Sequence, residues 1–174
     1  MTKLEIIQKL EEGFSIVGKT LSDTSEDIFH RRKDERWSVA ENTEHLILSV
    51  KPLNKAFALP NFVLLFFGKL NRPQKGYEEI VTLYHQKLAE GAVATPQFIP
   101  RENTAHKEKI QLTEDFEKTN QEFIKRIQSF SEEDLDKYLL PHPVLGKLTI
   151  REMLYFTIYH TLHHHKAIIF QKQS

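Results

Sequence analysis

The 174-residue sequence contains no cysteine, and this absence limits the chemistry of any site that the chain can build. Disulfides, iron–sulfur clusters and thiolate zinc sites all need cysteine sulfur, so they are excluded. A site for a transition metal must therefore use histidine, with carboxylate or water as further ligands. The lack of disulfides also suits a reducing compartment.

Net charge is absent as well, because 24 basic side chains balance 24 acidic ones. A basic surface is the usual electrostatic footprint of a protein that binds nucleic acid or an anionic membrane. We therefore expect no nucleic-acid partner and no membrane partner.

Long apolar runs are missing too. The most apolar stretch, residues 62–67, is far shorter than the roughly 20 residues of a membrane-spanning helix. The N-terminus begins Met1-Thr2-Lys3-Leu4-Glu5, with an acidic residue where a signal peptide would carry a basic region and an apolar core. We expect a soluble cytoplasmic protein in which residues 1–174 form one domain.

Three helix starts carry the pattern Ser/Thr-x-x-Glu, in which the hydroxyl caps an early N–H group and the glutamate reaches back to the cap residue. An apolar series at helical spacing follows each of them. The pairs are Thr2 with Glu5, Ser38 with Glu41, and Thr149 with Glu152.

Two more helices are expected, one from about residue 77 to residue 90, before Gly91, and one from His106 or Thr113 to Phe130. No alternating strand pattern occurs, so the sequence predicts an all-α bundle with short extra helices in the connections.

The connections carry the helix breakers. Pro52 should kink or end the helix that starts after Ser38, and residues 58–70 can then form a separate short helix. Residues 91–103 are predicted to form a long loop, and residues 139–148 a structured connector.

A histidine tract lies in the last predicted helix. His160 and His164 are four residues apart and therefore on one helix face, where both can ligate one metal ion. His45 lies two turns after its helix cap among apolar neighbours, and it becomes a third ligand if it faces the last helix. Three protein ligands leave a coordination position open, which is typical of catalytic rather than structural zinc sites.

The order of these motifs resembles the DinB superfamily. The residues that carry the resemblance are the segment WSVAENTEHL from Trp37 to Leu46, the later segment His142-Pro143-x-x-Gly146-x-Leu148-Thr149-x-x-Glu152, and the pair His160-x-x-x-His164. The family includes YfiT-like metal-dependent hydrolases, bacillithiol transferases and mycothiol-dependent isomerases.

This resemblance implies an up-down-down-up four-helix bundle with a divalent metal ion, zinc or nickel, bound by His45, His160 and His164. It also implies transfer of a low-molecular-weight thiol to an electrophilic small molecule, or a related metal-dependent hydrolysis. Residues 51–101 carry no motif of the family, so we expect them to shape the substrate pocket.

Other interpretations of the same residues stay open. His160 and His164 can be ordinary buried histidines, and the bundle can be a non-catalytic metal-binding or dimerisation domain that acts through a partner. A metal-free bundle that binds heme or lipid is a weaker alternative, since heme needs an axial histidine and a large cleft.

The residues around the proposed ligands have their own expected roles. Glu41 can orient the imidazole of His45, but the capping box already uses it, and Glu44 is expected to be a surface charge. His163 can face the pocket or support a ligand, whereas His165 should face outward or lie at an interface. The remaining histidines are expected to be solvated: His30, His85, His106 and His142.

Several aromatic residues can line an apolar pocket, although core packing explains them better. They are Trp37, Phe57, Phe62, Phe66 and Phe67. The apolar stretch 64–67 can also form a dimer interface, so a homodimer is expected.

Overall fold

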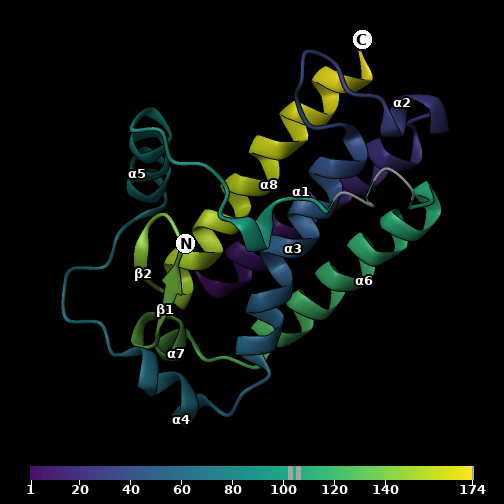
Figure 1. Ribbon diagram of the computed structural model, residues 1–174. Helices are drawn as coiled ribbons and strands as arrows, with labels where there is room; N and C mark the ends of the chain where they lie inside the picture. Colours follow the sequence, from purple (N-terminus) through teal and green to yellow (C-terminus); the bar gives the residue numbers. More distant parts are fainter. Residues whose placement is uncertain (102–103, 105–106, 174) are drawn as a thin grey trace.

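Four long helices form the framework of the computed structural model, which describes residues 1–101, 104 and 107–173 (Figure 1). The helices are α1 (Lys3–Ser22), α3 (Val39–Phe57), α6 (Lys109–Gln128) and α8 (Ile150–Lys172). The three predicted capping boxes begin α1, α3 and α8, with both reciprocal hydrogen bonds present in each. The predicted start at His106 lies outside the described residues, and α6 begins at Lys109.

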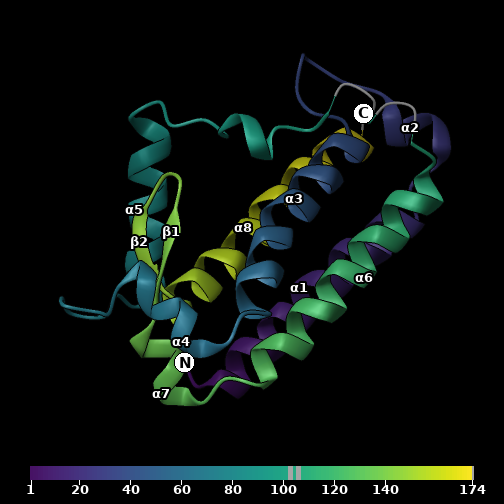
Figure 2. The same cartoon turned by 60° about the horizontal axis from the view of Figure 1, so that its bottom comes forward.

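The directions of the four helices follow from contacts near their ends. The contacts are Thr20 with His165 for α1 and α8, Asn42 with His164 for α3 and α8, and Phe57 with Phe123 for α3 and α6. Helices α1 and α8 are therefore parallel, while α3 and α6 both run the opposite way (Figure 2). This confirms the up-down-down-up four-helix bundle.

Short elements occupy the connections between the long helices. They are α2 (Glu26–His30), α4 (Asn61–Leu64), the 3-10 helices η1 (Leu65–Phe67) and η2 (Pro96–Phe98), α5 (Tyr77–Ala89), α7 (Glu132–Lys137), and the strands β1 (Leu139–His142) and β2 (Gly146–Thr149). Helix α5 ends before Gly91, whose φ of +90° suits glycine.

Two local expectations hold only in part. Helix α3 does not end at Pro52 but continues to Phe57, because burial of Val50, Asn54 and Phe57 against the bundle offsets the loss of one backbone hydrogen bond. The connector 139–148 is structured as expected, but it contains two strands that the sequence analysis did not predict, which form an antiparallel β-hairpin and pair Leu139 with Thr149. Strands of four residues are too short to show a readable alternation.

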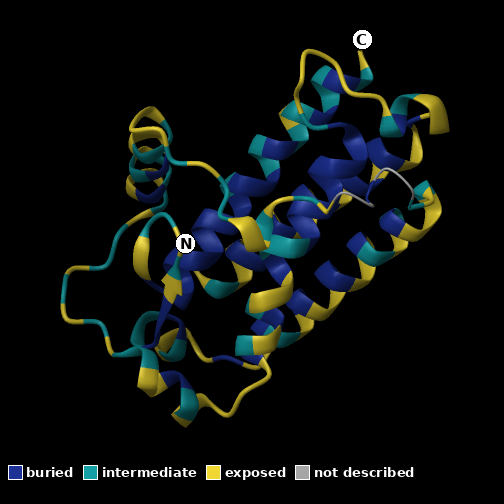
Figure 3. Cartoon of the chain, viewed as in Figure 1, coloured by how far each residue is buried: buried dark blue, intermediate teal, exposed yellow. Residues whose placement is uncertain are grey.

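The core lies between the four long helices, and their outer faces are exposed (Figure 3). Phe57 is a core residue, since its ring stacks on Phe123 at 5.6 Å and contacts Phe130 edge-on at 5.1 Å. Phe62 and Phe66 are 66% and 86% exposed, so they are not core residues. In the described part of the chain, no helix is both long and apolar enough to span a lipid bilayer.

A buried ion pair fixes the segment before α5 against the start of α8. The carboxylate of Glu152 is fully buried and accepts hydrogen bonds from the Arg72 guanidinium at 2.7 and 2.6 Å and from the Lys75 N–H at 2.7 Å. Burial raises the pKa of Glu152, but the hydrogen bonds from Arg72, Lys75 and Thr149 outweigh it and hold the pKa below its usual value. The carboxylate is therefore ionised at neutral pH.

Replacing this carboxylate tests its contribution to stability. We expect Glu152→Gln to lower the free energy of unfolding by on the order of 3 kcal/mol at pH 7, because a buried pair is broken. The difference from wild type should shrink as the pH falls through the lowered pKa of Glu152, where the wild-type pair is also lost. Urea unfolding at several pH values measures both effects.

Glu122→Gln is the matched control, since Glu122 forms a more exposed pair with Arg126 one helical turn away. It should change stability by no more than about 0.5 kcal/mol. Equal losses for the two variants would show that the Glu152 pair contributes no more than a surface pair.

Candidate metal centre

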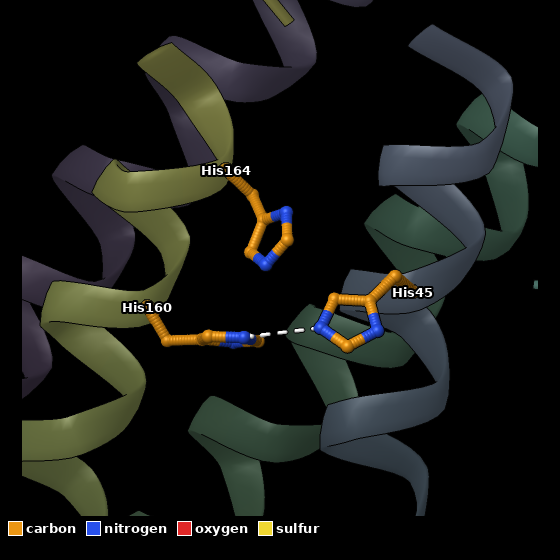
Figure 4. A group of neighbouring side chains, drawn as sticks. All are labelled: His45, His160 and His164. Carbon is orange, nitrogen blue, oxygen red and sulfur yellow. Dashed lines mark hydrogen bonds between the residues drawn. The ribbon is translucent and has the colours of Figure 1, made fainter. Parts of the chain in front are cut away.

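Three histidines from two helices converge in the bundle interior (Figure 4). His45 comes from α3, and His160 and His164 come from successive turns of α8. Each offers a ring nitrogen, and these nitrogens all lie within 4.8 Å of one another. The structure thus brings together the three histidines that the sequence predicts as ligands, and their metal binding stays a prediction.

The helix geometry explains the convergence. Because α3 and α8 pack antiparallel, the second turn of α3 faces the C-terminal half of α8, where the spacing of four residues stacks His160 and His164 on one face. The three side chains are no more than 8% exposed. Buried imidazoles need hydrogen-bond partners or a metal ion.

Backbone and side-chain oxygens fix the protonation of two of the rings. Nδ1 of His45 lies 2.6 Å from the carbonyl oxygen of Phe98, which can only accept a hydrogen bond, so Nδ1 carries the proton. Nδ1 of His164 likewise donates to Oδ1 of Asn42 at 2.8 Å. The Nε2 atoms of His45 and His164 therefore present lone pairs.

The acceptor on Asn42 is itself held in place. Its amide nitrogen donates to the carbonyl oxygens of Trp37 and Ser38, both at 2.9 Å, and this fixes which end of the amide faces His164. Asn42 lies at the start of α3, one turn before His45. A single helix turn thus supplies one candidate ligand and the support for another.

The neutral state of the three imidazoles and the spacing of their nitrogens fit a divalent cation. Burial, together with the neighbouring imidazoles, holds the pKa values of His160 and His164 well below the usual value, and burial lowers that of His45 despite the Phe98 carbonyl. Nε2 of His45 lies 3.1 Å from Nε2 of His160. Two nitrogens bound at about 2.1 Å to one zinc ion would lie roughly 3 to 3.5 Å apart.

The connection between α5 and α6 is tied to the site by Glu44. This residue is only 3% exposed, and its carboxylate accepts from the Arg101 N–H at 3.0 Å and the Lys107 ammonium at 2.7 Å, and from the Thr104 hydroxyl. The expectation of a surface charge at Glu44 is wrong, because the returning connection covers it. This anchor holds the segment that carries the Phe98 carbonyl next to His45.

Glu41 caps the start of α3 and does not orient His45. Its carboxylate completes the capping box with Ser38, and it also pairs with Arg32. The partner of the second nitrogen of His45 is the Phe98 carbonyl instead. A backbone carbonyl in a loop carries no residue-type signal, so the sequence could not indicate it.

A cavity of about 280 Å³ lies beside the three histidines. Among the described residues that line it, none carries a carboxylate, an ammonium or a guanidinium group. The apolar part of the lining includes Trp37, Leu46, Val50, Leu88, Val93, Met153 and Phe156. Phe62, Phe66 and Phe67 do not line it, although Trp37 does, with its ring centroid 5.0 Å from that of His45.

The other histidines differ in their positions. His142 lines the cavity and His30 is half-buried, so the expectation that both are solvated is wrong. His163 also lines the cavity, whereas Nε2 of His165 contacts the Thr20 hydroxyl at 2.9 Å between α1 and α8. His85 is exposed as expected and bonds to the Tyr159 hydroxyl.

Removing the Asn42 acceptor tests how the cluster is oriented. We expect Asn42→Leu to weaken zinc affinity by about 10- to 100-fold, because loss of an outer partner frees the ring of His164. Asn54→Leu is the matched control: Asn54 is a buried asparagine of the same helix that bonds to the Thr119 carbonyl instead. Competition with a coloured chelator measures both affinities, and equal affinities for the two variants would contradict the orienting role.

Two solved structures share the fold at low sequence identity. YfiT from Bacillus subtilis, described as a probable metal-dependent hydrolase with an unusual four-helix bundle topology, matches with a TM-score of 0.66 and 16% identity, over 98% of this chain and 86% of that chain. The colibactin self-resistance protein ClbS, solved in complex with a dsDNA, matches with a TM-score of 0.59 and 15% identity, over 99% and 96%.

The ClbS structure overturns the expected set of partners. Nucleic acid was excluded because the net charge is zero, and that exclusion is wrong, since a protein with this fold is found bound to dsDNA. Net charge describes the whole molecule and says little about one face of it.

A comparison with curated proteins finds no match. The sequence model of the DinB superfamily, in contrast, matches residues 10–168, a range that includes all three histidines and all four long helices except the outer ends of α1 and α8. The chain belongs to the DinB superfamily.

Proposed function

We propose that the protein is a divalent-metal-dependent enzyme that transfers a low-molecular-weight thiol to an electrophilic small molecule. The observation that carries the proposal is a set of three neutral imidazoles with convergent nitrogens, beside a cavity whose described lining is uncharged. Three ligands leave a position at which a thiol can bind.

A zinc or nickel ion at this position would lower the pKa of a coordinated thiol and so raise its thiolate fraction at neutral pH. The protein's own residues do the rest of the work. His45, His160 and His164 would hold the ion, while Asn42 and the Phe98 carbonyl fix two of the rings. The apolar cavity wall holds the electrophile against the site and keeps water away from it.

The described cavity lining fits thiol transfer. Attack by a thiolate forms a sulfur–carbon bond and releases the leaving group with its electron pair, and it needs no general base once the thiol has ionised. Hydrolysis at the same centre would need a water activated by the metal ion, or a base such as His142 or His163 of the described lining. A related hydrolase is the second candidate, because YfiT is described as a probable metal-dependent hydrolase.

Metal content and thiol consumption together test the proposal. Untagged protein prepared without a nickel column should contain about one equivalent of metal and should accelerate the reaction of cysteine with 1-chloro-2,4-dinitrobenzene, which releases chloride. His45→Ala should lose both metal and rate, because two ligands on one helix bind more weakly than three. His85→Ala should lose neither, since His85 lies outside the cavity lining.

Bound metal without any rate with thiols and electrophiles would favour the non-catalytic alternative. In that case chelation should lower the melting temperature strongly, because a ligand that binds only the folded state stabilises it. Metal loss that leaves a demonstrated rate unchanged would contradict the proposed role of the histidines.

A further inference from the structure

His142 lies at the end of β1, where the hairpin meets the cavity. Its ring packs edge-on against Phe156, with ring centroids 4.3 Å apart, and Phe156 in turn stacks on His160 at 4.9 Å. His142 is half-buried and lines the same cavity as the three candidate ligands. It is therefore a polar group in an otherwise largely apolar wall.

The hairpin turn decides which nitrogen of His142 carries the proton. Nδ1 accepts hydrogen bonds from the backbone N–H groups of Val144 at 3.2 Å and Leu145 at 3.0 Å, so it must present its lone pair. Burial lowers the pKa of His142 to about 4, and the ring is neutral at pH 7. The single ring proton is therefore on Nε2, which has no hydrogen-bond partner among the described residues.

Two other residues of the cavity wall each carry a buried polar atom without a hydrogen-bond partner. Nδ2 of Asn120 and Oγ1 of Thr95 are buried and have no partner within the described part of the chain. Other polar side chains of the described lining, such as Ser49, Tyr84 and Thr157, are also uncharged residue types. The described wall thus offers neutral hydrogen-bonding groups and no charge.

We propose that His142 determines substrate specificity by donating a hydrogen bond from Nε2 to an acceptor, such as a carbonyl oxygen, on a neutral and mostly apolar electrophile. That the ligand is an electrophile rests on the proposed function, but the hydrogen bond from His142 to the ligand needs no metal ion. Away from the proposed metal position, the described lining has no charged side chain that would compensate a buried charge, so the part of the ligand that faces His142 is expected to be neutral.

A purely structural role for His142 would involve Nδ1 alone, as the acceptor that stabilises the hairpin turn. The two roles can be separated because asparagine also accepts from the N–H two residues ahead, in an Asx turn, but places no donor where Nε2 lies. His142→Asn therefore keeps the turn contact to Val144 and removes the proposed donor.

The probes are acetophenone and cumene, two neutral aromatic molecules of similar shape, of which only acetophenone has a carbonyl acceptor. Their dissociation constants are measured by ligand-observed NMR on zinc-loaded and on metal-free protein. Wild type should prefer acetophenone, and His142→Asn should reduce that preference by about 3- to 10-fold, as expected for one hydrogen bond. His85→Asn, which changes an exposed histidine outside the cavity lining, should keep the wild-type preference.

An unchanged preference in His142→Asn, or no preference for acetophenone in wild type, would overturn the inference. A second measurement does not depend on the variant's folding. In wild type the Nε2–H resonance of His142 should move on addition of acetophenone and not of cumene, and no movement would count against the donor. A preference for acetophenone in metal-free protein supports the inference even if thiol transfer is disproved. Failure of the inference about His142 can therefore be distinguished from failure of the proposed function.

Discussion

The packing of α3 against α8 is the contact on which the site depends, because it buries three imidazoles that would otherwise be solvated. Burial disfavours their charged forms and lowers the pKa values of all three. It also requires a partner for each polar nitrogen, and the Phe98 carbonyl and the Asn42 amide supply two of them. The same oxygens leave Nε2 of His45 and His164 with lone pairs that face the shared space.

Support for the site reaches well beyond the two helices that carry the ligands. The connection between α5 and α6 brings the Phe98 carbonyl to His45, and Glu44 anchors this connection through Arg101 and Lys107. Glu44 and His45 are neighbours in sequence, so one turn of α3 both provides a candidate ligand and holds the segment that orients it. A change in this connection would therefore alter the metal centre as well as the cavity.

Sequence patterns predicted the local features and missed those that depend on distant contacts. Capping boxes involve residues three apart, so Ser38 and Thr149 marked the starts of α3 and α8 correctly. His160 and His164 share a face by helical spacing alone, and the family resemblance added His45. Glu44 and His142 were misplaced because their burial depends on where the α5–α6 connection and the hairpin return, which no short pattern encodes.

The absence of charge around the described site has a chemical consequence of its own. Three neutral imidazoles would leave the full charge of a divalent ion uncompensated, in an apolar setting where electrostatic interactions are strong. Such an ion binds an anionic ligand strongly and acidifies a coordinated thiol more than one already neutralised by carboxylates. A nearby carboxylate would weaken this effect, and the acidic residues adjacent to the ligands, Glu41 and Glu44, are paired with Arg32 and Lys107 instead. The pairing of these two carboxylates outside the cavity lining is therefore part of the support for the proposed thiolate chemistry.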